Sequence, residues 1–213
     1  MFNKINPITR TVVILLAIVA LMAGLLLSQH VHKKKVDISQ LHGTLLDKPR
    51  SLPSFSLLGT DHKPFDNARL NGSWTFIFFG FTNCGYLCPT TMAELGKMYR
   101  LLDKNQVQPM PQVVMISLDP ARDDLDKLKH YVTAFDGHFY GARGSDNVIK
   151  ALTNDLGVAY FNVMPKAGDD SKHDSIDHSG AILLVNPQGQ LVAFFTTPHD
   201  AEWLAKDYQQ LVA

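Results

Sequence analysis

The stretch WTFIFFGFTNCGYLCPTTMAELGKMYRLL, residues 74–102, joins a strand pattern to a helix pattern through two cysteines. Trp74 to Phe79 is a continuous apolar run rich in aromatic side chains, which is typical of a strand buried on both faces. Thr90 to Leu102 then places apolar residues at helical spacing, and Pro89 suits the first turn of a helix. The stretch therefore predicts a strand, a cysteine-bearing loop and a helix.

Strand and helix patterns continue to alternate on both sides of this stretch. They predict a hairpin over Phe55–Phe65, a second buried strand over Val113–Leu118, helices over Asp123–Phe135 and Ser145–Leu156, late strands over Ile182–Val185 and Leu191–Phe195, and a last helix over Asp200–Leu211 that His199 or Asp200 caps. Alternating elements followed by a late hairpin predict an α/β fold, with a mixed sheet flanked by helices.

Residues 11–28 are an apolar stretch near the start of the chain, and Val12 to Leu27 carry no polar side chain. This length is close to the roughly 20 residues that a helix needs to cross a membrane. A cleaved signal peptide is the alternative, but its apolar core usually has about 7–15 residues and ends at a small-residue cleavage site. Bulky Gln29 and His30 follow the stretch instead. We predict an N-terminal tail at 1–10, a transmembrane helix at 11–28, a linker at 29–50 and a folded domain at 51–213.

The charge distribution does not give the location of the folded domain, but it disfavours one class of partner. Basic residues lie on both sides of the apolar stretch, so the positive-inside rule does not orient it. A short N-terminal tail before a long domain resembles a single-pass signal anchor with an exported domain. Beyond residue 35 there are 15 basic and 20 acidic residues, a net charge near −5. Nucleic-acid binding needs clustered Lys and Arg on one face, and this composition does not favour it.

Cys84 and Cys88 lie where the buried strand ends and the next helix begins. A helix N-terminus favours anions, so we expect at least one thiol with a lowered pKa. An inert disulfide is the alternative in an exported protein with two cysteines. A bridge that closes so short a loop constrains the unfolded chain little, which makes stability a poor reason for the pair. We interpret the pair as a reactive dithiol.

Two soft thiolates suit a soft ion such as Cu(I), whereas a structural zinc ion needs four ligands. A third ligand would have to be a histidine, and spacing alone does not choose among the nine. They are His30, His32, His42, His62, His130, His138, His173, His178 and His199. His178 stands out because it lies after the polar loop 165–175 and just before a late strand. The alternative for any one of them is a surface histidine hydrogen-bonded to its neighbours.

Three motifs in this order resemble one known family. They are FGFTNC followed by CP at residues 79–89, SLDPARD at residues 117–123 and DHS at residues 177–179. They are similar to the Gly-Phe-Thr-x-Cys-Pro-x-x-Cys-Pro, Ser-x-Asp-Pro-x-Arg-Asp and Asp-His-Ser segments of the Sco/SenC copper chaperones of cytochrome c oxidase assembly. The likeness covers about residues 51–197.

The resemblance implies a thioredoxin-like domain with Cys84, Cys88 and His178 as copper ligands. It also implies a location in the periplasm or the mitochondrial intermembrane space, and delivery of copper to a cytochrome c oxidase subunit that carries a copper site. Another copper chaperone or a thiol–disulfide oxidoreductase is a further implied partner. Gly85 and Tyr86 stand where the family usually has Pro-Asp, so copper affinity or redox potential is expected to differ from the family norm.

Two aspartates are candidates for supporting the ligands. Asp119 lies near the end of the second predicted strand and is expected to orient a ligand or the cysteine loop. Its alternative role is a turn or helix cap. Asp177 immediately precedes the candidate ligand His178 and is the second supporting candidate.

Two functions compete on these residues, and whether the chain is an enzyme stays open. The first is a membrane-anchored copper chaperone. The second is a thiol–disulfide oxidoreductase in which Cys84 attacks and Cys88 resolves. A peroxidase is disfavoured because Phe81, three residues before Cys84, replaces the threonine of that class.

Overall fold

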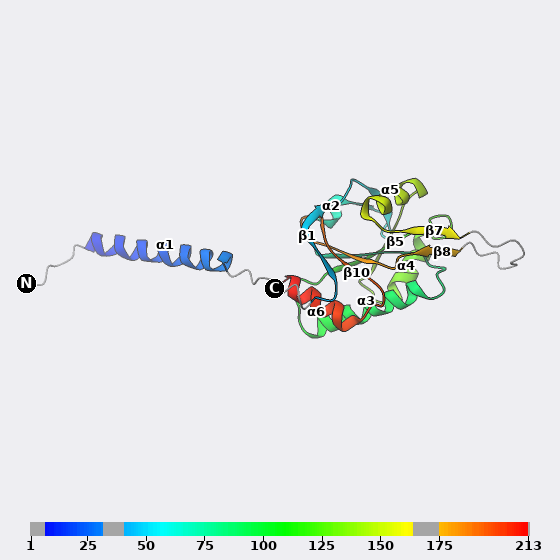
Figure 1. Ribbon diagram of the computed structural model, residues 1–213. Coiled ribbons are helices and arrows are strands. Elements are labelled where there is room, and N and C mark those ends of the chain that lie inside the picture. Colours follow the sequence, from blue (N-terminus) through cyan, green and yellow to red (C-terminus); the bar gives the residue numbers. More distant parts are fainter. Residues whose placement is uncertain (1–6, 32–40, 164–174, 213) are drawn as a thin grey trace, which may run out of the picture. The chain divides into compact units, whose positions relative to one another are not determined.

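The computed structural model of the protein describes residues 7–31, 41–163 and 175–212 (Figure 1). Two compact units are distinguished, residues 1–37 with 213, and residues 38–212. In the first unit, helix α1 covers Pro7–Val31. Among the described residues, no helix combines the length and apolarity needed to traverse a bilayer. The transmembrane helix at 11–28 therefore stays a prediction.

The second unit is built on an eight-stranded mixed sheet with the order β1-β10-β9-β4-β5-β6-β2-β3. Strands β4, β5 and β6 are parallel neighbours, and the other pairings are antiparallel. The strands are β1 Thr44–Ser51, β2 Ser56–Gly59, β3 Pro64–Asp66, β4 Thr75–Gly80, β5 Gln112–Ser117, β6 Tyr140–Arg143, β9 Ile182–Val185 and β10 Gln190–Phe195. The predicted mixed sheet, the early hairpin β2–β3 and the late hairpin β9–β10 are confirmed.

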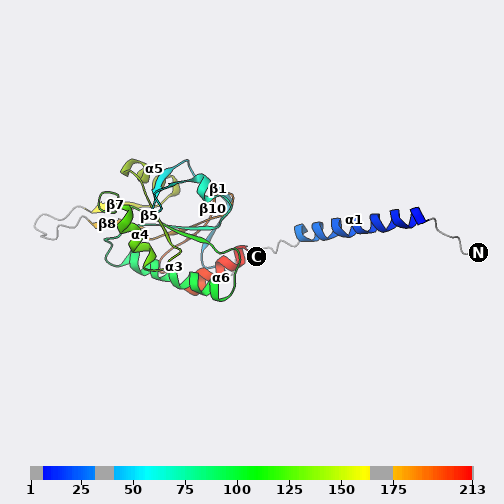
Figure 2. The same ribbon diagram turned by 180° about the vertical axis from the view of Figure 1, so that it is seen from behind.

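Helices cover both faces of this sheet. They are α2 Asn67–Leu70, α3 Leu87–Lys104, α4 Leu125–Thr133, α5 Asp146–Leu156 and α6 Ala201–Val212. Figures 1 and 2 show α3 and α6 on one side of the sheet and α5 on the other. Every residue of β4 is buried, as predicted for a central strand. Asp200 caps α6, since its Oδ1 accepts the N–H groups of Glu202 and Trp203 at 2.9 and 3.0 Å.

Strand β1 lies largely within residues 29–50, which the sequence analysis assigned to the linker. Its side chains are mostly exposed, and it is held by antiparallel pairing with β10, Thr44 facing Phe194. Because β1 is an edge strand with few large apolar side chains, its sequence lacks the pattern of a buried strand.

A separate two-stranded ribbon, β7 Tyr160–Val163 and β8 Ser175–His178, carries the Asp-His-Ser motif. Its strands are antiparallel, with Tyr160 opposite His178 and Phe161 opposite Asp177. They lie side by side in both ribbon views. The sequence analysis did not predict this ribbon.

Candidate functional site

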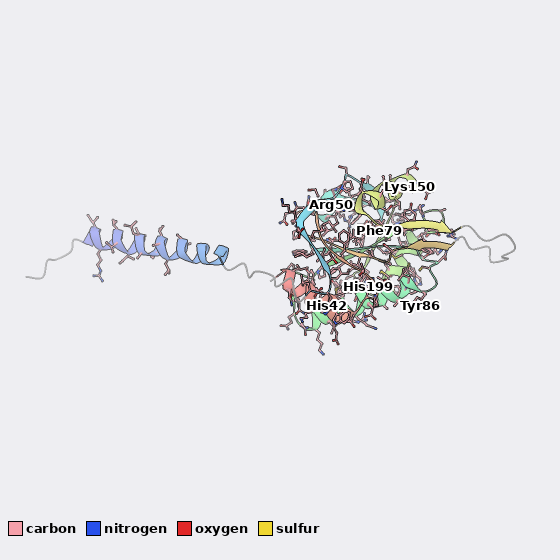
Figure 3. All side chains as sticks on the ribbon, in the orientation of Figure 1. His42, Arg50, Phe79, Tyr86, Lys150 and His199 are labelled. Carbon is pink, nitrogen blue, oxygen red and sulfur yellow. The ribbon has the colours of Figure 1, made fainter. Side chains whose placement is uncertain are left out.

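The cysteine loop runs from the end of β4 to the start of α3. The N–H of Leu118, just after β5, donates to the carbonyl of Gly80 at 2.8 Å, and the N–H of Cys84 donates to the carbonyl of Phe81 at 3.3 Å. These bonds fix the loop to the edge of the sheet where β4 and β5 end. In Figure 3 Tyr86, whose side chain is 79% exposed, marks the loop between the two cysteines.

Both cysteines are thiols, and they differ in exposure. Cys88 is buried in the first turn of α3, while Cys84 is half-buried. Helix α3 begins without a side-chain cap from Tyr86. Instead, the N–H of Cys88 donates to Sγ of Cys84 at 3.2 Å. The sulfur of Cys84 thus accepts from one of the N–H groups that the first turn leaves without an intrahelical partner.

The electrostatic environment separates the two thiols further. The hydrogen bond with Cys84 and burial raise the pKa of Cys88, and the negative charge of Asp123 adds to the shift. Ionisation of Cys88 is therefore disfavoured, and Cys84 is the more accessible sulfur. This assignment agrees with the predicted order of a nucleophilic Cys84 and a resolving Cys88.

Asp123 holds the cysteine loop, a role that the sequence analysis did not give it. Its buried Oδ2 accepts the N–H of Thr82 at 3.1 Å and the hydroxyl of Ser117 at 2.7 Å. Its Oδ1 accepts the Thr82 hydroxyl, and Nζ of Lys127 lies 3.8 Å from the same oxygen. Asp123 thereby connects the end of β5 to the loop. The sequence feature that could have indicated this role is that Asp123 is the second aspartate of the SLDPARD motif.

Asp119, the aspartate that the sequence analysis chose, lies in the turn after β5. Its carboxylate pairs with Arg122, and its carbonyl accepts the N–H groups of Arg122 and Asp123 at 3.1 and 2.9 Å. These contacts fit the turn-cap alternative. Asp119 shapes the turn that presents Asp123 to the loop.

The hydroxyl of Tyr131, on α4, is a second feature that the sequence analysis missed. The oxygen is buried and has no hydrogen-bond partner among the described residues. Burial raises the pKa of Tyr131, and the negative charges of Cys88, Cys84 and Asp123 raise it further. Tyr131 is therefore a neutral hydroxyl within electrostatic reach of both sulfurs. Tyr131 lies beside the apolar stripe of α4, three residues after Leu128 and four before Phe135, so the helical pattern did not single out its hydroxyl.

His178 and Asp177 are the last two residues of β8, and their side chains lie outside the described part of the structure. The backbone that follows them is described. The N–H of Ser179 donates to the carbonyl of Ala159 at 3.0 Å, and Gly180 has a φ of 65°. A Cβ placed on Gly180 would lie 3.1 Å from Cδ2 of Leu87, the first residue of α3. The segment after His178 thus packs against the helix turn that contains Cys88.

His199, close to the start of α6, also contacts this segment. Its Nε2 lies 2.8 Å from the carbonyl oxygen of Gly180, so the neutral ring donates there. Burial lowers the pKa of His199, against the opposing effects of the Gly180 carbonyl and Glu94. His199 therefore stays neutral near pH 7 and positions the chain two residues after His178.

Within the described residues, no three His, Cys, Asp or Glu side chains form a group suited to a metal ion. The side chain of His178 is not among those described. The predicted ligand set of Cys84, Cys88 and His178 therefore stays a prediction, with the two cysteines placed together and the backbone after His178 packed beside them.

Comparison with known proteins identifies the family. The SCO1/SenC family model matches residues 44–213, most of the chain. The chain belongs to the SCO1/SenC family. The resemblance drawn from the three motifs is thereby confirmed, and so is the thioredoxin-like character of the mixed sheet.

Individual SCO1/SenC relatives agree with this assignment. A protein of Stutzerimonas stutzeri named for copper binding is 31% identical over 175 residues, covering 82% of this chain and 83% of its own length. The mouse mitochondrial SCO2 homolog is also 31% identical, over 75% of this chain and 61% of its own length. The crystal structure of yeast Sco1 with copper bound is similar with a TM-score of 0.68 and 27% identity, covering 77% of this chain and 89% of that one.

Proposed function

We propose that this chain is a membrane-anchored copper chaperone. Cys84, Cys88 and His178 bind copper, and the chain passes it to a copper site in a cytochrome c oxidase subunit. The observation that carries the proposal is the close packing of two segments. The segment after His178, at Gly180, contacts Leu87 of the turn that holds the two thiols. Family membership and the copper-bound yeast relative support the choice of metal.

The donor set suits copper in its reduced form. Two thiolates and one neutral imidazole are soft or borderline ligands, which Cu(I) prefers. Three ligands also leave the ion open to exchange with the ligands of an acceptor. Copper is the cargo in this proposal, and Cys84, the more accessible sulfur, is the first contact for an incoming or outgoing ion.

Copper binding in this proposal requires the reduced dithiol. Thiolates bind metal, whereas a disulfide between Cys84 and Cys88 has no thiolate to offer. Oxidation of the pair would therefore release copper or prevent its binding. This couples delivery to the redox state of the compartment.

Thiol–disulfide exchange with the cysteines of an exported or oxidase-subunit partner is the second candidate function. The observation that favours it is the unequal environment of the two thiols, since Cys84 is accessible while Cys88 is buried and its pKa is raised. Nucleophilic attack by Cys84 and resolution by Cys88 follow from that difference. His178 is dispensable for this function.

Membrane anchoring and export complete the proposal. The apolar run Val12–Leu27 within α1 supports a single-pass anchor. A domain in the periplasm or the mitochondrial intermembrane space would then face an exported oxidase site. A reporter fused to the C-terminus of the full chain tests this directly. Activity of the reporter on the cytoplasmic side would contradict both candidate functions.

Titration of the reduced full chain with Cu(I) in detergent separates the two candidates. We expect tight binding by the wild type and loss of tight binding in Cys84→Ser, Cys88→Ser and His178→Ala. The matched control is His138→Ala, because His138 is an exposed histidine paired with Asp136 at 2.9 Å. It should bind copper as the wild type does.

Dithiol exchange is measured on the same proteins with a small disulfide. If His178→Ala binds copper as tightly as the wild type while both cysteines remain necessary for exchange, the three-ligand site is wrong. Thiol–disulfide exchange would then be the function that the dithiol supports.

A further inference from the structure

Lys127, in the first turn of α4, contacts both the cysteine loop and the turn that follows β5. Its Nζ donates to Oδ1 of Asn83 at 3.2 Å and to the carbonyl of Arg122 at 3.1 Å. The same nitrogen lies 3.8 Å from Oδ1 of Asp123. A lysine ammonium has three donor hydrogens, so one side chain can serve several oxygens at once. Lys127 thereby joins the helix, the turn and the loop.

Both residues that precede Cys84 are tied to the chain around Lys127. Thr82 bonds to Asp123 through its N–H and through its hydroxyl. Asn83, the next residue, bonds through its side chain to Lys127. Asp123 and Lys127 are only four residues apart, and the N–H of Lys127 is itself held by the cap of α4. The backbone before Cys84 is therefore attached to one fixed stretch of chain.

The backbone after Cys84 is less restricted. Gly85 and Tyr86 are exposed, and a Cβ added to Gly85 would meet no atom within 4 Å. Glycine has more conformational freedom than any other residue, so Gly85 does little to fix the residue before it. The contacts that precede Cys84 therefore contribute more to its position than those of Gly85.

We propose that Lys127 is a positioning residue for copper binding, which acts on Cys84 through the side chain of Asn83. The proposal deepens the proposed function, because it rests on Cys84 being a copper ligand. A loop that becomes ordered only when the ion binds lowers the affinity, since conformational entropy is lost at that step. The bond from Lys127 orders the loop before copper arrives.

A double-mutant cycle on Lys127 and Asn83 tests the proposal. Cu(I) affinity is measured by competition with a chelator, on the reduced full chain in detergent. We expect Lys127→Met to weaken binding by about fivefold, less than the loss of a group bonded directly to a ligand. Asn83→Ala, which removes the acceptor and keeps the lysine, should weaken binding equally. The double variant should bind as each single variant does, because one bond is lost in all three.

Lys127→Arg and Lys129→Met are the controls. Arginine can still donate to Asn83, so Lys127→Arg should stay within about twofold of the wild-type affinity. Lys129→Met removes the same charge two residues further along α4. Lys129 is exposed, and within the described residues its side chain has no hydrogen bond or ion pair. It should bind Cu(I) as the wild type does, and a loss equal to that of Lys127→Met would indicate a general charge effect.

Deuterium uptake of the metal-free, reduced protein is a second readout, which needs no copper. The amides of Thr82 and Cys84 should exchange faster in Lys127→Met and in Asn83→Ala than in the wild type, because the loop opens more often. The melting temperature should stay near that of the wild type, since Lys127 is partly exposed and such contacts add little to global stability. A merely structural role would lower the melting temperature and leave Cu(I) affinity unchanged.

Three results would overturn the proposal. They are wild-type affinity and loop exchange in Lys127→Met, no effect of Asn83→Ala, and losses that add in the double variant. A wild type that binds no Cu(I) would defeat the proposed copper function and with it the copper role of Lys127. Deuterium uptake would then decide separately whether Lys127 orders the cysteine loop.

Discussion

Cys84 and Cys88 occupy different environments although they share one loop. Cys84 is half-buried and its sulfur accepts the N–H of Cys88, whereas Cys88 is fully buried and its pKa is raised by the hydrogen bond with Cys84 and by burial. The fold thereby leaves the first cysteine accessible and disfavours ionisation of the second. The second cysteine is protected from solvent.

Single-thiol variants test this difference. Cys88→Ser retains only Cys84, and Cys84→Ser retains only Cys88. We expect Cys84 to react with iodoacetamide at least about tenfold faster near pH 8, because the thiolate is the nucleophile and Cys88 is buried. The rates are measured by mass spectrometry. Equal rates for the two variants would contradict the assignment.

Asp123 is expected to contribute more to stability than the adjacent Asp124. Asp123→Asn removes a buried carboxylate that accepts from Thr82 and Ser117, and we expect a loss of about 1.5–3 kcal/mol of unfolding free energy. Urea unfolding of the reduced protein measures it. Asp124→Asn is the control, because asparagine can still cap α4 at Lys127 and should change stability by less than about 0.5 kcal/mol.

At the scale of elements, the site is made where three separate segments end. Strand β4 leads into the cysteine loop, β5 leads into the turn with Asp119 and Asp123, and β8 ends at His178. The two parallel strands end at the same edge of the sheet, which brings their loops together. Gly180 then closes the remaining distance to α3.

Gly180→Ala tests that close approach. Gly180 has a φ of 65°, and an added Cβ would lie 2.9 Å from Cγ2 of Thr197 and 3.1 Å from Leu87. Left-handed backbone strain alone is about 1–2 kcal/mol for a residue with a side chain. We expect lower stability and weaker Cu(I) binding, measured by urea unfolding and by competition with a Cu(I) chelator.

Gly85→Ala is the control for Gly180→Ala. A Cβ on Gly85 would meet no atom within 4 Å, and its φ is not positive. It should leave the free energy of unfolding near that of the wild type. A larger effect of Gly85→Ala than of Gly180→Ala would contradict the packing argument.

The sequence predicted the strands and helices whose own residues show a regular pattern of apolar side chains. The apolar run of β4, the helical stripe of α3 and the run of β5 depend on residues close in the chain, so local periodicity was enough. Strand β1 pairs with the distant β10 and has mostly exposed side chains, and β7 forms its ribbon by pairing with β8, so local periodicity predicted neither of them. The contacts of Asp123 and the burial of the Tyr131 hydroxyl could not be predicted from the sequence, because they depend on how β5, α4 and the cysteine loop pack together.

At the scale of the whole molecule, pH acts on the folded unit through groups whose pKa differs between the folded and unfolded states. Burial lowers the pKa of His199 below its usual value of 6.5. The unfolded chain then binds more protons than the folded chain as pH falls through 6.5, so the folded state loses stability. Burial raises the pKa of Asp61, but hydrogen bonds from Tyr140 and Arg69 outweigh this effect and lower that pKa below 3.8. The contribution of Asp61 to stability is therefore lost only as the pH falls below 3.8.

The window between pH 7.5 and 5.5 therefore isolates the histidine contribution from that of Asp61. We expect the reduced wild type to be less stable at pH 5.5 than at pH 7.5 in urea unfolding. His199→Gln, which can still donate to the carbonyl of Gly180, should show a smaller loss. An equal loss of unfolding free energy in both proteins would show that His199 does not cause the pH dependence.

The sulfur of Cys84 has two roles. It accepts the hydrogen bond of the Cys88 N–H, which caps α3, and it is the accessible sulfur of the reactive dithiol. A thiolate, free or bound to an ion, accepts a stronger hydrogen bond than the sulfur of a disulfide, so the cap on the first turn of α3 is weakest in the oxidised protein. Deuterium uptake at the Cys88 amide should then be higher in the oxidised protein than in the copper-loaded protein. The chemical state of the Cys84 sulfur is then reported by a backbone amide in the first turn of α3.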